Sequence, residues 1–201
     1  MNEKLDVKEI IKVGAILFVI TALAAAVLGF VNSKTAPLIA ENNVIKEQTA
    51  LKNVMPDAVS FEEVEITPAL TALADETSGE ISKAFIALDS NSEKIGACVI
   101  TVTTGYDVGI QTATGIDNDL VITGVDIISM NETPGLGANA SKPEFREQYV
   151  GKADNLSVVK SSPNEYTVQA IAGVTKTSNG VTNGVNIARK AAEIILEGGN
   201  G

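Results

Sequence analysis

The sequence predicts an α+β protein, with a mainly antiparallel sheet and flanking helices tethered by one N-terminal transmembrane helix. Three observations carry this prediction. Residues 13–31 form an uncharged and largely apolar run. Between residues 84 and 129, short segments rich in β-branched residues alternate with turn residues, as in a sheet of consecutive strands. Residues 181–195 repeat apolar residues at helical spacing, which indicates an amphipathic helix that packs on the sheet.

The apolar run at 13–31 is predicted to be a retained membrane anchor. Its length gives a helix of about 28 Å at 1.5 Å per residue, which matches the hydrocarbon core of a bilayer. Lys12 and Lys34 bracket it. A cleaved signal peptide is the alternative, but its apolar region spans about 7–15 residues and follows a more purely basic start. Lys4, Lys8 and Lys12 precede the run, which favours this end inside the cell and the remainder outside.

Composition excludes several classes of function. Acidic residues outnumber basic ones by 25 to 15, which gives a net charge of −10 and makes nucleic acid an unexpected partner. The chain has no His, so Ser-His and Cys-His nucleophiles and haem ligation by His are excluded. Its one cysteine, Cys98, cannot supply the four thiolates of an iron–sulfur cluster. If the protein carries out redox chemistry, we expect an organic cofactor.

We expect three parts: a membrane anchor at 1–34, a juxtamembrane helix and acidic linker at 35–82, and a folded domain at 83–201. Pro37 is expected to interrupt the chain just beyond the membrane. Apolar residues at roughly helical spacing then predict a helix that ends before Pro56. The stretch at 60–82 is acidic and poorly periodic, which predicts a loop with a short helix around 69–74.

The remaining elements follow from local pattern. Strands are predicted at 84–88, 95–103, 108–114, 120–129, 158–160 and 166–171, and a short helix at 143–150. Turn residues at 115–119 are expected to separate the third strand from the fourth. In the last helix, Ser178 is the expected N-cap, and Gly198 and Gly199 are the expected stop.

Three motifs could carry chemistry. Residues 172–178 read Ala-Gly-Val-Thr-Lys-Thr-Ser and precede the last helix, where small residues and free helix amides can hold a phosphate. Residues 131–137 read Asn-Glu-Thr-Pro-Gly-Leu-Gly, in which Pro-Gly predicts a type II turn that presents Leu136. Residues 105–110 read Gly-Tyr-Asp-Val-Gly-Ile and enter a strand. Taken alone, each motif is better explained as an ordinary turn, loop or helix cap than as a binding site.

Together and in this order, the three motifs resemble the FMN-binding domain family, most closely its branch formed by the G subunits of Rnf complexes. The resemblance runs from the anchor to the last helix, and Glu-Thr-Pro-Gly-Leu-Gly is its most specific element. It implies that FMN is joined by a phosphoester to Thr175. The cofactor-binding residues that it implies are Thr175, Gly173, Val174, Thr177, Ser178, Glu132, Thr133, Pro134, Gly135, Leu136, Gly137 and Tyr106.

The sequence departs from the pattern of that family at four positions. Ala172 stands where Ser or Thr is usual, and Val174 where Ala is usual. Gln169 stands where an upstream Asp is common, and Met130 where a His is usual. The hydroxyl of Thr175 and the preceding Gly173 are kept, so the resemblance still implies attachment at Thr175.

The resemblance implies an electron-transfer subunit of an ion-translocating ferredoxin:NAD oxidoreductase complex, with no catalysis of its own. Its partners would be the other membrane subunits of the Rnf complex and a flavin transferase for maturation. It would lie in the bacterial inner membrane by a single pass, with its soluble domain on the extracytoplasmic side. Two alternatives remain open: the related flavoprotein of a sodium-translocating NADH:quinone reductase, known as its C subunit, and a flavin-free tethered scaffold of the same fold.

Overall fold

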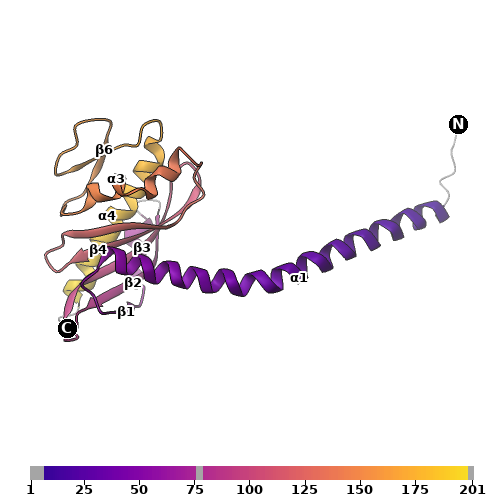
Figure 1. The fold of residues 1–201 in the computed structure, drawn as a ribbon, viewed down its shortest axis with the longest axis horizontal. Coiled ribbons are helices and arrows are strands. Elements are labelled where there is room, and N and C mark those ends of the chain that lie inside the picture. The colour runs from indigo at the N-terminus through magenta and orange to yellow at the C-terminus, as the bar shows by residue number, and fades with distance from the viewer. Residues whose placement is uncertain (1–6, 76–78, 199–201) are drawn as a thin grey trace. The chain divides into compact units, whose positions relative to one another are not determined.

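The computed structural model describes residues 7–75 and 79–198. The chain forms two compact units, residues 1–45 and 46–201. The first unit is helical where it is described, and the second contains a five-stranded antiparallel sheet with helices (Figure 1). The predicted α+β class is confirmed.

Helix α1 (Val7–Val54) contains the predicted membrane span and continues beyond it. Pro37 lies inside this helix, so the prediction that it interrupts the chain is wrong. A proline removes a single backbone donor, and here helix-forming residues flank it on both sides, so the ladder resumes after one lost hydrogen bond. Among the described residues, α1 is the one helix long and apolar enough to cross a membrane.

The sheet is a meander in which each strand pairs with the next one along the chain. Its strands are β1 (Ser60–Val64), β2 (Gly79–Leu88), β3 (Lys94–Thr104), β4 (Val108–Asp117) and β5 (Ile122–Ser129), all antiparallel. Helix α2 (Pro68–Asp75) lies between β1 and β2 in the chain. The connections from β2 to β3, β3 to β4 and β4 to β5 are hairpins that need only short turns, which is why turn residues recur regularly in this part of the sequence.

Both faces of the sheet are covered. Ala84, Val99 and their neighbours pack against α2 and the long C-terminal helix on one face. Cys98, Ile100 and their neighbours pack on the other face against the end of α1, around Leu51. Since alternate residues of a strand point to opposite faces, a strand buried on both faces needs apolar or small residues throughout. This explains the nearly unbroken apolar run of β3.

Three strand predictions need correction. Residues 60–64 form β1 and residues 79–82 belong to β2, although the sequence predicts a loop at both places. Residues 115–117 belong to β4 and are not the turn that the sequence predicts. Gly115 is required for packing, because a Cβ there would lie 2.3 Å from the carbonyl oxygen of Val54 in α1. Thr123 of β5 donates a hydrogen bond to the same oxygen at 2.6 Å.

The segments between β5 and the last helix form a second layer next to β5. It consists of the 3₁₀ turn η1 (Gly137–Ser141), α3 (Pro143–Arg146), η2 (Glu147–Tyr149) and the parallel pair β6 (Ser157–Val159) and β7 (Thr167–Gln169). The last helix, α4 (Thr175–Glu197), follows this layer in the chain. Helix α4 runs along β3 and β4 and buries Val181, Val185 and Ala188. Phe145 and Tyr149 pack in the same cluster as Val181 and Val185.

Helix α4 begins earlier than the sequence predicts. Its N-cap is Val174, so Ser178 lies within the first turns and the prediction that Ser178 caps the helix is wrong. The hydroxyl of Ser178 instead donates to the Val174 carbonyl at 3.1 Å and accepts the backbone amide of Ile171 at 3.0 Å. These two bonds fold the loop before α4 back on the helix. Gly198 follows the helix end as predicted, and Gly199 lies outside the described residues.

Candidate functional site

One buried carboxylate connects the three motifs. Glu132, which follows β5, is 8% exposed. Its Oε1 accepts the backbone amides of Tyr106 at 2.8 Å and of Asp107 at 3.3 Å, in the turn between β3 and β4. Its Oε2 accepts the hydroxyl of Thr177, in the first turn of α4, at 2.9 Å. Segments separated by 25 to 45 residues in the chain therefore meet at a single side chain.

Two glycines leave the space that this carboxylate fills. A Cβ at Gly105 would lie 2.3 Å from Oε1 of Glu132, and a Cβ at Gly137 would lie 2.3 Å from Oε2. Neither glycine has a positive φ, so their small size, rather than backbone freedom, is what the structure needs here. A glycine of the 105–110 motif and a glycine of the 131–137 motif thus serve the same contact.

The Glu-Thr-Pro-Gly-Leu-Gly loop forms the predicted turn. The Leu136 amide donates to the Thr133 carbonyl at 3.1 Å, with Pro134 and Gly135 at the two central positions. Gly135 has φ +78°, the value that a type II turn requires there. The turn leaves the Leu136 side chain 51% exposed. A large apolar side chain is therefore exposed to solvent four residues after the buried glutamate.

The loop before α4 has a backbone that an anion can approach closely. Gly173 has φ +76°, a conformation that favours glycine. The N-cap, Val174, makes no side-chain hydrogen bond to the first helix amides, which leaves those amides and the positive end of the helix dipole to a ligand. A cavity of about 350 Å³ opens beside this loop, lined by Lys160, Ala170, Ile171, Ala172, Gly173 and Thr175.

The three hydroxyls at the start of α4 differ in their environment. Thr175 is exposed and lines the cavity. Thr177 is fully buried and donates to Glu132, and Ser178 is fully buried and bonded to the backbone. Among the three, Thr175 therefore has the hydroxyl that a second molecule can reach.

One lysine lines the cavity together with Thr175, and a second lysine is the next residue in the chain. Lys160, which directly follows β6, lines the same cavity, and none of the three sequence motifs includes it. A lysine after a three-residue strand has no sequence signal that connects it with a motif further along the chain. Lys176 follows Thr175, and its ammonium lies 5.5 Å from the ring centre of Tyr106, a cation–π contact. Lys176 also lines a larger cavity, of about 530 Å³, along α4.

The structure thus brings together most of the residues that the sequence singles out. Glu132, Gly137, Thr177 and the backbone of Tyr106 meet directly. Thr175 and Gly173 line the cavity at the start of α4, and Leu136 lies on the turn that follows Glu132. The Tyr106 ring itself is 78% exposed, so it borders the site rather than filling it.

Comparison with known proteins agrees with this arrangement. A family model described as an FMN-binding domain matches residues 105–190, which contain all three motifs. A second model, described as the RnfG N-terminal region, matches residues 1–54, which contain the apolar helix. Fold and site together define the class: a membrane-anchored protein with an FMN-binding domain.

Relatives that match nearly the whole length of the chain show to which branch of this family it belongs. The chain is 42% identical to the G subunit of the Na(+)-translocating ferredoxin:NAD(+) oxidoreductase complex of Acetobacterium woodii, over 92% of both chains. It is 32% identical to the G subunit of the ion-translocating oxidoreductase complex of Methanosarcina acetivorans, over 91% of this chain and 94% of that protein. The chain belongs to the RnfG family, the G subunits of ion-translocating oxidoreductase complexes.

Similarity to the C subunits of Na(+)-translocating NADH-quinone reductases is shorter. The protein from Vibrio anguillarum is 39% identical over 30% of this chain and 28% of its own length. Among solved structures, the corresponding protein from Parabacteroides distasonis has a TM-score of 0.54 at 22% identity, covering 78% of this chain and 92% of that one. NqrC from Shewanella oneidensis has a TM-score of 0.52 at 18% identity, covering 72% and 74%. These structures share the fold.

Proposed function

We propose that this protein is the electron-transfer subunit of a membrane-bound ion-translocating ferredoxin:NAD oxidoreductase complex, and that it carries FMN covalently on Thr175. Membership of the RnfG family and the FMN-binding domain support the role and the cofactor. FMN supplies the redox chemistry when bound, and the chain contributes binding, orientation and the electrostatic environment. This division suits a sequence without His and with a single buried Cys.

The observation that carries the attachment site is the contrast among the three hydroxyls at the start of α4. Attachment forms a bond from the hydroxyl oxygen to the phosphorus atom of an activated flavin donor, while the bond from phosphorus to the leaving group breaks and the hydroxyl proton is lost. It therefore requires a hydroxyl that can reach the phosphorus atom. Thr175 is exposed on the cavity wall, whereas the hydroxyl proton of Thr177 is donated to Glu132 in the interior. Attachment at Ser178 would remove the hydroxyl proton that this buried side chain donates to the Val174 carbonyl.

The surroundings of Thr175 suit a phosphate group. No side-chain cap occupies the backbone amides of the first turn of α4. These amides and the helix dipole favour negative charge at the N-terminal end of the helix. Lys160 adds a positive charge to the cavity wall, in a chain whose net charge is −10. A Cβ at Gly173 would be strained at φ +76° but would meet nothing within 4 Å, so the chain leaves open space beside this backbone.

Residues on the other two motifs are proposed to lie along the flavin ring. Thr133, Pro134, Gly135 and Leu136 form the turn next to Glu132, and Leu136 is exposed there as an apolar contact. The Tyr106 ring, with the Lys176 ammonium over it, borders the site from the hairpin between β3 and β4. A cation near the flavin ring would raise the reduction potential of the flavin, because positive charge favours the more negative reduced form.

We also propose the partners and the sidedness of the domain. No residue in the apolar window of α1 is buried within the described chain, as expected for a helix surrounded by lipid and by other membrane subunits of the complex. The lysines before the span favour a cytoplasmic N-terminus and an extracytoplasmic domain. Outside the cytoplasm no FMN pool could replace a lost cofactor, so covalent attachment by a flavin transferase has a physical purpose.

Substitution of Thr175 by Val tests the attachment. Valine keeps the β-branched shape and removes the nucleophilic oxygen, so the fold of α4 is retained. With a flavin transferase co-expressed, the wild-type chain is expected to give a fluorescent flavin band in a denaturing gel, and Thr175→Val a dark one. Thr177→Val removes a competing hydroxyl and serves as the control, and it is expected to keep its fluorescent flavin band. A fluorescent Thr175→Val band would reject the assignment.

The same gel separates the proposed role from the flavin-free scaffold. A wild-type chain that carries no flavin after co-expression with the transferase would favour the scaffold. Co-purification with the ferredoxin:NAD oxidoreductase subunits rather than with a quinone reductase separates the RnfG role from the NqrC role. The match to RnfG relatives over more than nine-tenths of the chain favours the former.

A further inference from the structure

The surroundings of Glu132 indicate that its carboxylate holds parts of the chain together rather than contacts a ligand. It is 8% exposed, and three donors from the chain itself occupy it: two backbone amides on Oε1 and the Thr177 hydroxyl on Oε2. A carboxylate offers about four acceptor directions, and the close backbone at Gly105 and Gly137 crowds the rest. Little of this side chain is left to meet a bound molecule.

We infer that Glu132 is a positioning residue of the flavin site, which acts by fixing the Tyr106 hairpin and the first turn of α4 to one point. This inference rests on the proposed function, because it concerns the site in which the flavin would lie. Charge-assisted hydrogen bonds of this kind are stronger and shorter than neutral ones, which suits a connection between loops that no regular ladder joins.

Glu132 acts through two separable contacts. Through Oε1, it holds the hairpin whose Tyr106 ring lies under the Lys176 ammonium. Through Oε2, it holds Thr177, two residues after the proposed attachment point, and keeps that hydroxyl committed as a donor. Loss of the contact at Oε1 would let the hairpin move. Loss of the contact at Oε2 would let the first turn of α4 change its orientation. Either change would alter the surroundings of the flavin without touching it.

Variants of the full-length membrane protein, produced with and without the flavin transferase, test both contacts. Glu132→Ala removes both of them. Thr177→Val removes the contact to Oε2 and leaves Oε1 to the hairpin. Glu132→Gln keeps the size and an acceptor oxygen for the Tyr106 amide, and serves as the conservative rescue. Glu144→Ala, an exposed glutamate of α3, is the matched control.

Two readouts apply. Hydrogen exchange of peptides containing the Tyr106 and Asp107 amides reports the hairpin in the flavin-free chain. Visible circular dichroism and the midpoint potential report the surroundings of the attached flavin. We expect faster exchange and shifted flavin properties in Glu132→Ala. Thr177→Val is expected to keep the exchange protection and to shift only the flavin properties, Glu132→Gln to lie between wild type and Glu132→Ala, and Glu144→Ala to match wild type.

Wild-type exchange at these amides in Glu132→Ala, or wild-type dichroism and potential in its attached flavin, would overturn the inference. If Glu132→Ala does not fold, the Thr177→Val variant tests the inference instead. Unchanged dichroism and midpoint potential of the flavin in Thr177→Val would contradict positioning through Oε2. Exchange needs no flavin, so an absence of covalent flavin in the wild type rejects the proposed function by itself. Altered exchange in Glu132→Ala would still support Glu132 as the residue that holds the hairpin.

Discussion

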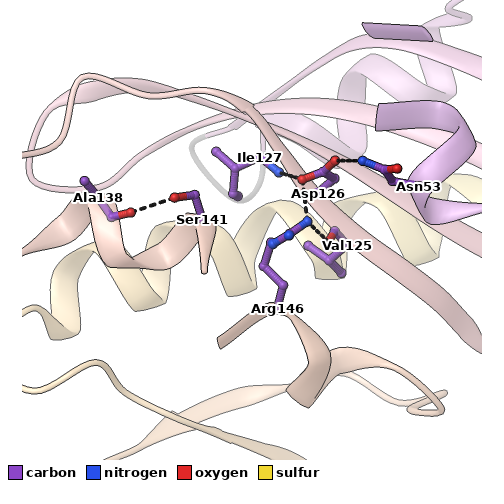
Figure 2. Close-up of polar contacts among 7 residues, drawn as sticks. All are labelled: Asn53, Val125, Asp126, Ile127, Ala138, Ser141 and Arg146. Atoms are coloured by element: carbon purple, nitrogen blue, oxygen red, sulfur yellow. Dashed lines mark hydrogen bonds and ion pairs between the residues drawn. The ribbon is translucent and has the colours of Figure 1, made fainter. Parts of the chain in front are cut away.

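Asn53, in the last turn of α1, donates a hydrogen bond to Asp126 of β5 at 2.7 Å. The other oxygen of Asp126 pairs with the guanidinium of Arg146 on α3, which also donates to the Val125 carbonyl at 3.2 Å (Figure 2). Figure 2 shows Asp126 between these two partners, so one carboxylate joins a helix end, a strand and the second layer of the domain.

Removal of this carboxylate is expected to destabilise the domain. Asp126→Ala leaves the guanidinium of Arg146, about one-fifth exposed, without its anion. The side chains are only partly buried, so we expect a loss of about 1–3 kcal/mol rather than the larger cost of a fully buried pair. Chemical or thermal unfolding of the detergent-solubilised chain measures it. Asp119→Ala, in an exposed turn, is the control, and equal stability of the two variants would contradict the prediction.

The sequence predicts most of the fold because the meander depends on local signals. Strands β3 and β5 and helix α4 follow from apolar pattern and turn residues within each segment. Strand β1 is not predicted because it is an edge strand with two exposed glutamates, which looks like an acidic loop until β2 pairs with it. Gly115 resembles a turn residue, and only the approach of Val54, from a distant part of the sequence, explains it.

The site is predictable in part for the same reason. The turn at Pro134 and Gly135 and the loop at Gly173 have conformations that their own residues dictate. The contacts that join the motifs depend on tertiary structure: neither the meeting of Glu132 with Thr177 nor the position of Lys160 is encoded in any local spacing. Ser178 has the chemistry of an N-cap, yet the bond it accepts comes from Ile171, before the helix begins.

Cys98 is expected to be a reporter of unfolding. It is fully buried on β3, and burial raises the pKa of its thiol to about 12. Because the folded pKa lies above that of a free thiol, this group contributes to stability below about pH 8.5 and the contribution is lost as pH rises toward the folded value. At about pH 8, a thiol reagent should modify the native chain slowly and the urea-unfolded chain rapidly. Rapid modification of the native chain would contradict the burial.

The chain is expected to remain with membranes after extraction with high salt or alkaline carbonate. Residues 13–31 are uncharged and long enough for the hydrocarbon core, and burying them in lipid removes large exposed apolar side chains such as Phe18 and Leu28 from water. Detergent should release the full-length chain. Recovery of a shortened chain in the soluble fraction would show that the segment is a cleaved signal peptide.

Leu136→Asp tests whether the turn contacts the flavin ring. Leu136 is about half exposed, so replacing it should change the stability of the flavin-free chain by less than about 0.5 kcal/mol. Thr175 is unaffected, so the amount of attached flavin should stay close to that of the wild type. A carboxylate beside the ring would disfavour added negative charge, so the midpoint potential is expected to fall, with a shift in the visible spectrum. Val59→Asp, another exposed apolar residue, is the control. An unchanged potential and spectrum in Leu136→Asp would show that the turn does not contact the flavin, and would leave its role to the packing around Glu132.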